Sequence, residues 1–273
     1  MRWSDIGQSS NVEDRRGMGG PMMIGGGGIG VLILALAIWL CGGDPSKLLQ
    51  QGGPGPDVQQ PGAANNAPQP QDQNRAFAGA IEKSLEDTWK QTLQSQAPRV
   101  RYSSPVLVLF TGQVQSACGM TTSATGPFYC PGDRKLYLDF AFFDELRREF
   151  KSPGDFAQAY VIAHEFGHHI QNLMGTMDRL QNGSNRASVA LELQADCYAG
   201  IWANTAQKQG RLEAGDAEEA LRAASAVGDD TIQKRTQGYV VPDSFTHGSS
   251  QQRIEWFSRG MQTGDMRQCQ TFR

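Results

Sequence analysis

The chain has 273 residues, of which 39% are hydrophobic and 19% charged, a composition that allows a globular domain with a buried core. The formal net charge is -3, so the strongly basic balance of nucleic-acid-binding proteins is absent and we expect no nucleic-acid partner. No internal repeat is visible, which excludes a solenoid.

The first predicted element is an apolar segment, residues 22–41, with the sequence MMIGGGGIGVLILALAIWLC and no charged side chain. At about 1.5 Å rise per residue its length matches the hydrocarbon core of a bilayer, so we predict one transmembrane helix. A cleaved signal peptide is the alternative, but no small-x-small cleavage site follows the apolar run.

The charges beside this segment predict its orientation. Arg2, Arg15 and Arg16 precede it, whereas Lys47 is the one basic residue in the stretch of similar length that follows. Because the more basic flank of a membrane helix usually stays inside, we expect residues 1–21 in the cytoplasm and the remainder of the protein in the periplasm or outside the cell.

A polar tether follows the apolar segment. Residues 42–75 are rich in Gly, Pro, Gln and Asn and hold few apolar side chains that could offset the entropy of ordering them. We therefore expect a flexible connection to one compact domain, residues 76–273.

Four cysteines lie in this domain, in a compartment that would permit disulfides. Cys118 and Cys130 bracket a short Gly/Thr/Ser-rich loop and are the preferred pair, which by elimination leaves Cys197 with Cys269. Free buried thiols are the alternative, and the lack of a CxxC spacing excludes a zinc ribbon.

The first half of the domain is predicted to hold one helix and a small sheet. Residues 76–93 carry apolar side chains four apart, a helical stripe that indicates core packing. Residues 105–111, PVLVLFT, predict a strand, and residues 128–138 predict a hairpin around a Pro-Gly-Asp turn.

The second half is predicted to be helical. Asp155 can cap a helix through the histidine-rich segment, and Ser184 or Asn185 can cap one that ends at Gly210. Two further helices are expected over residues 216–227 and 249–261. Strands come first and most helices later, so we predict an α+β fold.

The histidine-rich segment, VIAHEFGHHIQNL at residues 161–173, holds three of the four histidines. His164 and His168 are four apart, so on a helix they project from one face and can bind a single Zn²⁺ ion. Glu165 follows the first histidine and is placed to take a proton from water at the ion's open position and to deliver it to a leaving amine. His169 points away from this face, and we expect it either to pack in the interior or to face solvent.

The third ligand is expected to come from another helix. The HExxH pattern alone arises by chance, and Gln171 and Met174 occupy the positions where metzincins have a glycine and a third histidine, respectively. In LELQADCYAG, residues 191–200, Glu192 can be the third ligand while Asp196 accepts the N–H of a ligating histidine. Two solvated acids are the alternative, but the surrounding residues are apolar, and buried unpaired carboxylates are costly.

Two further features complete the predicted site. Gly167 lacks the side chain that a helix favours, which predicts close approach of the helix that carries Glu192. His247, at the start of the last helix, could donate to the oxyanion of a tetrahedral intermediate, with Arg253 fixing the local geometry. A surface histidine is the alternative, and Tyr239 is a weaker candidate for the same role.

HEFGHH, ELQADCYAG and THGSSQQR occur in this order behind NVEDRRG and the apolar segment. This combination resembles the bacterial family of predicted neutral zinc metallopeptidases, over nearly the whole chain, and the His-His-Glu arrangement is similar to the gluzincin branch of the zincins. The resemblance implies His164, His168 and Glu192 as metal ligands and Glu165 as the catalytic base. It also implies a sheet whose edge strand holds an extended peptide above the active helix, with the hairpin at 128–138 as the candidate edge.

These patterns predict a zincin-like α+β domain that acts as a membrane-anchored, zinc-dependent endopeptidase on peptide or protein substrates. Two alternatives stay open. One is a zinc-stabilised, non-catalytic envelope binding or scaffold protein, in which Asp196 or His247 would be a fourth ligand. The other is a metal-dependent amidase acting on cell-wall peptides, which the same residues would serve. No sequence feature indicates the cleavage preference or the oligomeric state.

Overall fold

The computed structural model describes residues 1–17, 70–148, 154–178 and 184–272. These residues form seven α-helices, a four-stranded sheet and a two-stranded sheet, so the predicted α+β class is confirmed. In the part of the chain that is described, no helix is long and apolar enough to cross a membrane. The predicted span, 22–41, and residues 42–69 of the predicted tether lie outside that part.

The larger sheet has the strand order β1 (Val12–Asp14), β2 (Val106–Phe110), β6 (Lys135–Asp139) and β5 (Phe128–Cys130). The first three strands are parallel, and β5 pairs with β6 in antiparallel orientation. The predicted strand and the predicted hairpin are therefore both confirmed, and β5, like β1, lies at an edge of the sheet.

The smaller sheet is a hairpin of β3 (Gln113–Ser116) and β4 (Gly119–Thr122). Residues 119–129, which include β4, were expected to form a loop because Gly, Ser and Thr are typical of turns, and no element was predicted for β3. The disulfide between Cys118 and Cys130, with 5.9 Å between their Cα atoms, joins the hairpin to the end of β5. The preferred cysteine pair is thus confirmed.

The first long helix, α3 (Pro70–Gln96), contains the predicted helix and begins inside the predicted tether. Its stripe of Ile81, Leu85 and Trp89 is fully buried in the main hydrophobic core. The tether prediction is therefore wrong for residues 70–75, which continue the helix in the N-terminal direction.

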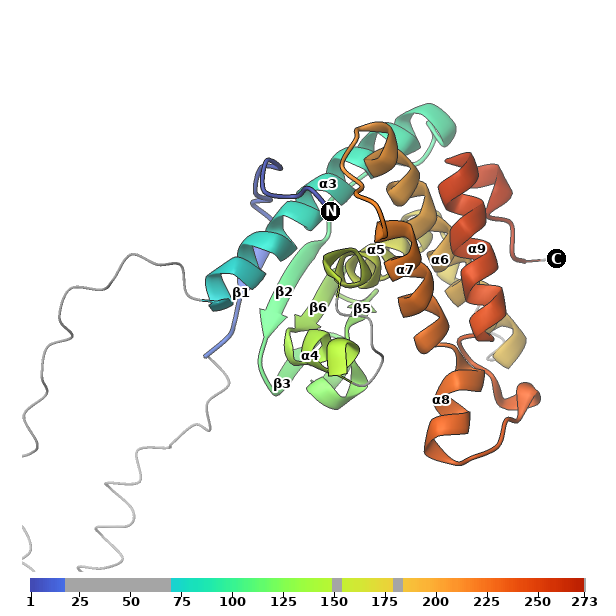
Figure 1. Ribbon diagram of the computed structural model, residues 1–273. Helices are drawn as coiled ribbons and strands as arrows, with labels where there is room; N and C mark the ends of the chain where they lie inside the picture. Colours follow the sequence, from blue (N-terminus) through green and yellow to red (C-terminus); the bar gives the residue numbers. More distant parts are fainter. Residues whose placement is uncertain (18–69, 149–153, 179–183, 273) are drawn as a thin grey trace, which may run out of the picture.

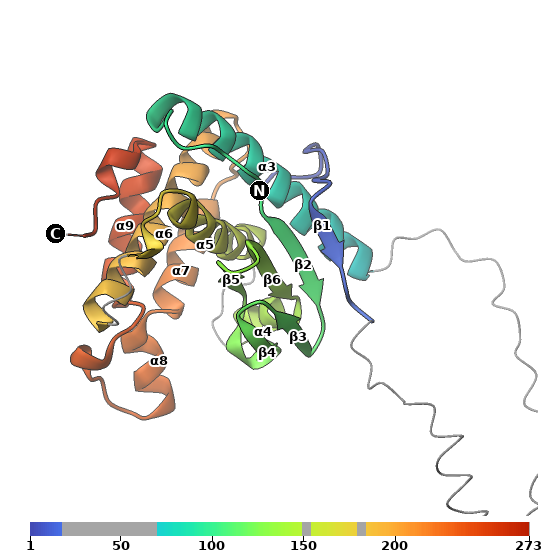
Figure 2. The ribbon, with the colours of Figure 1, turned by 180° about the vertical axis from the view of Figure 1, so that it is seen from behind.

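Six helices follow the sheet: α4 (Ala141–Arg148), α5 (Asp155–Leu173), α6 (Asn185–Lys208), α7 (Asp216–Ala226), α8 (Asp229–Thr236) and α9 (Ser250–Thr263). Four of them were predicted, whereas α4 and α8 were not. Figures 1 and 2 show α5 between the sheet on one side and α6, α7 and α9 on the other, with α3 crossing over them. The histidine-rich helix therefore lies at the centre of the domain.

The helix N-termini follow the predicted signals with one exception. The Ser184 side chain caps α6, and Ser249 forms a capping box with Gln252 at α9. Asp155, however, is the first residue inside α5 and does not cap it. Instead a carboxylate from α7, Glu219, accepts the backbone N–H of Phe156 at 3.2 Å.

Residues 1–17, here called the N-terminal arm, pack against the domain. Trp3 meets Phe77 edge-to-face with 5.4 Å between ring centroids. The amino group of Met1 lies 2.7 Å from a carboxylate oxygen of Asp155 and 3.3 Å from one of Asp216. Together with the pairing of β1 to β2, these contacts make the arm and the domain one structural unit.

This pairing contradicts the predicted placement of residues 1–21 in the cytoplasm opposite an external domain. A single membrane crossing between the arm and residue 70 would separate β1 from β2, which are hydrogen-bonded neighbours. Two of the arginines that predicted this orientation are paired with acids in the structure, Arg15 with Glu13 at 2.8 Å and Arg16 with Asp14 at 2.5 Å. The arm and the domain therefore lie on one side of any membrane.

Candidate active site

The site forms where α5 and α6 approach each other closely. A Cβ atom added to Gly167 would lie 3.0 Å from the carbonyl oxygen and 3.1 Å from the Cα of Ala195 on α6. The predicted reason for this glycine is thus confirmed. The close approach brings the histidine face of α5 against the carboxylates of α6.

Three of the predicted site residues converge at this contact. The Nε2 atom of His164 lies 3.0 Å from one carboxylate oxygen of Glu192, and the Nε2 atom of His168 lies 3.5 Å from the other. One donor atom from each of the three residues fits within 4.8 Å of the others. Two imidazoles and a carboxylate are a ligand set that zinc uses in proteins, so these residues fit a Zn²⁺ ion.

The protonation of the site is consistent with a cation position. Burial alone would lower the pKa of His164, but the carboxylates of Asp196 and Glu192 outweigh it and raise that pKa to about 10. Burial would raise the pKa of Glu192, yet both histidines lower it far below its usual range. In the metal-free protein a proton on His164 therefore supplies the positive charge that a metal ion would replace.

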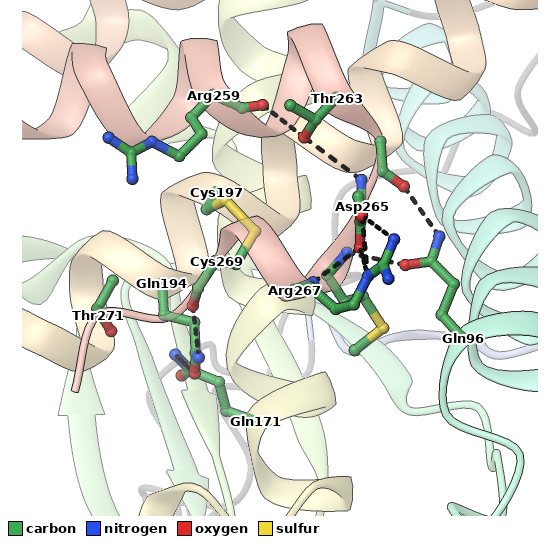
Figure 3. The surroundings of a disulfide bond; sticks show 12 residues. Gln96, Gln171, Gln194, Cys197, Arg259, Thr263, Asp265, Arg267, Cys269 and Thr271 are labelled. Carbon is green, nitrogen blue, oxygen red and sulfur yellow. Dashed lines mark hydrogen bonds and ion pairs between the residues drawn. A yellow bond between two sulfur atoms is a disulfide. The ribbon is translucent and has the colours of Figure 1, made fainter. Parts of the chain in front are cut away.

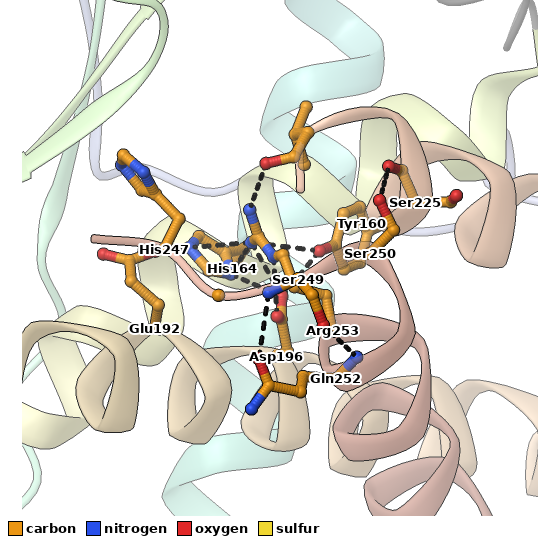
Figure 4. A network of polar contacts seen from close by, with 12 residues as sticks. Tyr160, His164, Glu192, Asp196, Ser225, His247, Ser249, Ser250, Gln252 and Arg253 are labelled. Atoms are coloured by element: carbon orange, nitrogen blue, oxygen red, sulfur yellow. Dashed lines mark hydrogen bonds and ion pairs between the residues drawn. The ribbon is translucent and has the colours of Figure 1, made fainter. Parts of the chain in front are cut away.

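Asp196 lies directly behind His164, as predicted for a residue that orients a ligand. Its Oδ1 atom lies 2.9 Å from Nδ1 of His164 and accepts a hydrogen bond from Tyr160 at 2.5 Å. Arg253 donates to both carboxylate oxygens, at 2.8 and 2.9 Å, and also to the carbonyl of Val227 at 3.2 Å. Figure 4 shows this network, which keeps the Nε2 atom of His164 directed at Glu192.

Burial would raise the pKa of Asp196, but the charges of Arg253 and His164 lower it to about 2. Asp196 is fully buried and Arg253 is 4% exposed, so this is an ion pair withdrawn from water. Arg253 was predicted only as a local support near His247. In the structure it is the counter-ion of the acid that orients His164.

The second histidine is oriented by a residue that the sequence analysis did not assign to the site. Gln171 is fully buried, and its Nε2 atom donates to the Leu191 carbonyl at 2.7 Å and to Gln194 at 3.2 Å. Its Oε1 atom, 2.8 Å from Nδ1 of His168, must therefore accept a hydrogen bond from the N–H at that nitrogen. This leaves the Nε2 lone pair of His168 free for a metal.

This arrangement extends to the second disulfide. Gln194 donates to the carbonyl of Cys269 at 2.9 Å, and Cys269 is bonded to Cys197, with 5.6 Å between their Cα atoms. Figure 3 shows Gln171 and Gln194 beside this disulfide. The pair reached by elimination is confirmed, and it anchors the C-terminal segment behind the predicted metal ligands.

Glu165 and His247 lie on the opposite, open side of the site. Both line two cavities, of about 250 and about 320 Å³, that meet beside the histidines. Burial raises the pKa of Glu165, while the two neighbouring histidines act in the opposite direction. A larger cavity, of about 720 Å³, lies at the carboxyl ends of β1, β2 and β6, and none of the predicted site residues lines it.

His247 is positioned by Asp229, which sequence reasoning missed. One oxygen of Asp229 accepts the backbone N–H groups of residues 246–248 at 2.6 to 3.0 Å, and the other lies 3.1 Å from Nδ1 of His247. This hydrogen bond raises the pKa of His247. The sequence signal that could have pointed to Asp229 is the Asp-Asp pair after Gly228, which is typical of the first turn of a helix. Tyr239, the weaker candidate, is 63% exposed and lines neither cavity of the site.

His169 is buried and connects α5 to the edge strand. Its Nε2 atom donates to the carbonyl of Ser103 at 2.7 Å, so its Nδ1 atom accepts from the Tyr129 hydroxyl on β5 at 3.1 Å. Asn172 donates to the same hydroxyl at 2.8 Å. Burial lowers the pKa of His169 to about 4, so it is neutral. The packing role, one of the two that were predicted, is confirmed.

Comparisons with known proteins show the family to which the chain belongs. "Uncharacterized protein YpfJ" of Escherichia coli strain K12 is 44% identical over 289 aligned positions, covering 100% of this chain and 99% of the relative. "Uncharacterized protein Mb2605" of Mycobacterium bovis is 45% identical over 207 positions, covering 71% of this chain and 69% of the relative. No solved structure matches the chain. The model of the family described as "putative neutral zinc metallopeptidase" matches residues 1–272, so the chain belongs to this family.

Proposed function

We propose that this protein is a zinc-dependent endopeptidase. The observation that carries the proposal is the convergence of His164, His168 and Glu192 beside Glu165 at an open cleft. Catalytic zinc sites have three protein ligands of this kind and keep a further position for water or substrate. A Zn²⁺ ion held there would supply Lewis-acid polarisation of the scissile carbonyl and of the attacking water.

Glu165 serves as the general base. It follows His164 on α5 and lines both cavities, so its carboxylate borders the space that the scissile bond would occupy. The rise in its pKa through burial makes its carboxylate a better proton acceptor. It takes a proton from the attacking water and returns it to the leaving amine.

His247 serves as a hydrogen-bond donor to the oxyanion that forms during attack. Asp229 holds its Nδ1 atom, and the raised pKa favours the imidazolium, which carries an N–H at Nε2 as well. Because His247 lines both cavities, this donor borders the reacting carbonyl.

The substrate lies along β5. This strand is at the edge of the sheet, and Phe128 and Tyr129 from it line the larger of the two cavities. An edge strand offers unpaired backbone groups to which an extended peptide can add as a further strand. The bonds from Tyr129 to His169 and Asn172 hold this edge against the catalytic helix.

The scaffold alternative requires a fourth protein ligand. The two candidates already have other partners: Asp196 is bonded to Arg253, Tyr160 and His164, and His247 is held by Asp229. This favours an open coordination position and hence the enzyme. A cell-wall amidase would use the same residues and differs from an endopeptidase in its substrate.

We further propose that the domain works in an oxidising compartment outside the cytoplasm, because its two disulfides are typical of such compartments. The N-terminal arm lies there with the domain. A single crossing by residues 22–41 is incompatible with the pairing of β1 and β2, and these residues lie outside the described ranges, so any other membrane attachment through them stays a prediction.

The test compares the full-length chain with Glu165→Gln and with Glu145→Gln, which changes an exposed glutamate on α4. Bound zinc is measured by elemental analysis, and hydrolysis is measured on a peptide library and on cell-wall peptides. We expect all three proteins to bind zinc and Glu165→Gln alone to lose about 10²–10⁴-fold in kcat. A zinc-loaded wild type that hydrolyses nothing, or a fully active Glu165→Gln, contradicts the proposal.

A further inference from the structure

The smaller cavity of the site, called here the apolar pocket, opens beside His164 and Glu165 and has a volume of about 250 Å³. Its walls come from the turn before β5 and from α4, α5, the end of α7 and α8. The apolar side chains and the glycine that form these walls are Gly126, Pro127, Phe142, Val161, Val227 and Ile232.

The one guanidinium that lines the pocket, Arg253, is already neutralised by Asp196. Arg253 gives its hydrogen bonds to Asp196, to the Val227 carbonyl and to Tyr160. Among the described residues that line the pocket, Glu165 is the one carboxylate, and it lies at the end that meets the metal ligands. His164 and His247 lie with Glu165 at this end, next to the metal site. A charged side chain that enters past them would lose water against the apolar walls, whereas an apolar side chain would gain from burial.

Ile232 gives independent support. It is the one apolar side chain in α8, whose sequence is DDTIQKRT, and it remains 36% exposed. Polar contacts hold α8 in place: Asp229 accepts the backbone N–H groups of residues 246–248, and Asp230 accepts the backbone N–H and the hydroxyl of Ser250 at 2.7 Å each. The helix therefore does not need Ile232 for its docking, and this side chain is free to form the wall of the pocket.

The second cavity differs in chemistry. It adjoins His168 and Glu192 and is lined by Ser188 as well as by apolar groups, whereas Thr125 and Pro127 border both cavities. The two cavities share Glu165 and His247, so a chain lying across these residues would place one side chain in each. The apolar pocket has walls from α4, α5, the end of α7 and α8 that enclose a side chain away from the metal ligands.

We propose that the apolar pocket binds a large aliphatic or aromatic side chain of the substrate, from the residue on one fixed side of the cleaved bond. The protein is then selective for peptides with such a residue at that position. This inference rests on the proposed peptidase function and adds the substrate class.

The test uses zinc-loaded full-length protein and terminally blocked peptides that carry Leu, Phe, Ala, Asp or Lys beside the scissile bond. Two variants are compared: Ile232→Lys and, as a matched control, Val241→Lys, which changes a 38%-exposed valine that does not line the pocket. Circular dichroism and zinc content check that both variants fold.

For the wild type we expect kcat/KM to be at least about tenfold higher with Leu or Phe than with Ala at one flanking position. Ile232→Lys should lower this preference by about tenfold and raise the relative rate for Asp, whereas Val241→Lys should keep the wild-type profile. Equal rates for Leu, Ala and Asp at both flanking positions, or an Ile232→Lys profile identical to that of the wild type, would overturn the pocket assignment.

If the wild type hydrolyses no peptide, the proposed function fails, but a binding measurement still tests whether the pocket prefers an apolar side chain. Fluorescence anisotropy then compares labelled Leu and Ala peptides on the same zinc-loaded proteins. Tighter binding of the Leu peptide that disappears in Ile232→Lys supports the pocket. Equal binding of the two peptides overturns it.

Discussion

Asp196→Asn is expected to weaken both the folded state and zinc binding. The carboxylate of Asp196 is fully buried, lies 2.9 Å from His164 and accepts two hydrogen bonds from Arg253. An asparagine keeps the shape and one acceptor oxygen but removes the negative charge. Arg253, 4% exposed, is then left as a buried cation without its counter-ion.

The two consequences have separable magnitudes. Removing one member of a buried ion pair costs about 3–5 kcal/mol, which for a domain of this size lowers Tm by about 6–20 °C. Loss of the charged acceptor behind a ligating histidine typically lowers metal affinity by about 10–100-fold. We therefore expect Asp196→Asn to unfold earlier without metal and to bind Zn²⁺ about 10–100-fold more weakly.

The assay measures thermal unfolding of the metal-free protein and zinc affinity by competition with a chelating dye. The double variant Asp196→Asn with Arg253→Met separates the two effects, since it removes the unpaired cation but does not restore the charged acceptor. It should regain most of the lost stability and none of the lost affinity. A single variant with wild-type Tm and wild-type zinc affinity would refute this account of the network.

Two other predictions concern regions outside the site. Burial raises the pKa of Glu82 well above its usual 4.5, and its carboxylate oxygens have no hydrogen-bond partner within the described ranges. The unfolded chain therefore ionises at a lower pH than the native one, and wild-type stability falls as pH rises above about 4.5, by up to about 1.4 kcal/mol per pH unit. Glu82→Gln should remove this slope in urea unfolding at about pH 6 and about pH 8, and an unchanged slope would count against a neutral native Glu82. For the N-terminal arm, Ser4→Cys and Gln94→Cys on α3 should react alike with a membrane-impermeant maleimide in intact cells; labelling of one alone would contradict the pairing of β1 with β2.

Local patterns predicted the elements that carry the site. The spacing of His164 and His168 and the spacing of Glu192 and Asp196 are helical repeats, and such repeats depend on residues within one turn. The close approach of α6 at Gly167 was predictable from a local signal as well, because a helix position without a side chain lets a neighbouring helix come closer. The serine caps of α6 and α9 are equally local signals.

Long-range contacts were not predictable in this way. The strand β1 has three residues, too few for a periodic pattern, and its partner β2 lies about ninety residues further along the chain. Arg15 and Arg16 were therefore interpreted as charges flanking a membrane helix, although they form ion pairs within the N-terminal arm. Asp229 lay in none of the predicted elements, and its bond to His247 forms because α8 and the segment before α9 meet in space.

The sequence by itself determined which side chains can bind a metal, since helix geometry relates residues four apart wherever the helix lies. The tertiary structure decided which groups surround those side chains: Arg253 behind Asp196, Gln171 behind His168, and Ile232 at the pocket. These contacts join segments that are distant in the chain or, for Gln171, depend on a buried bond to α6. Their energies arise from burial and charge pairing, which exist only after the helices have packed.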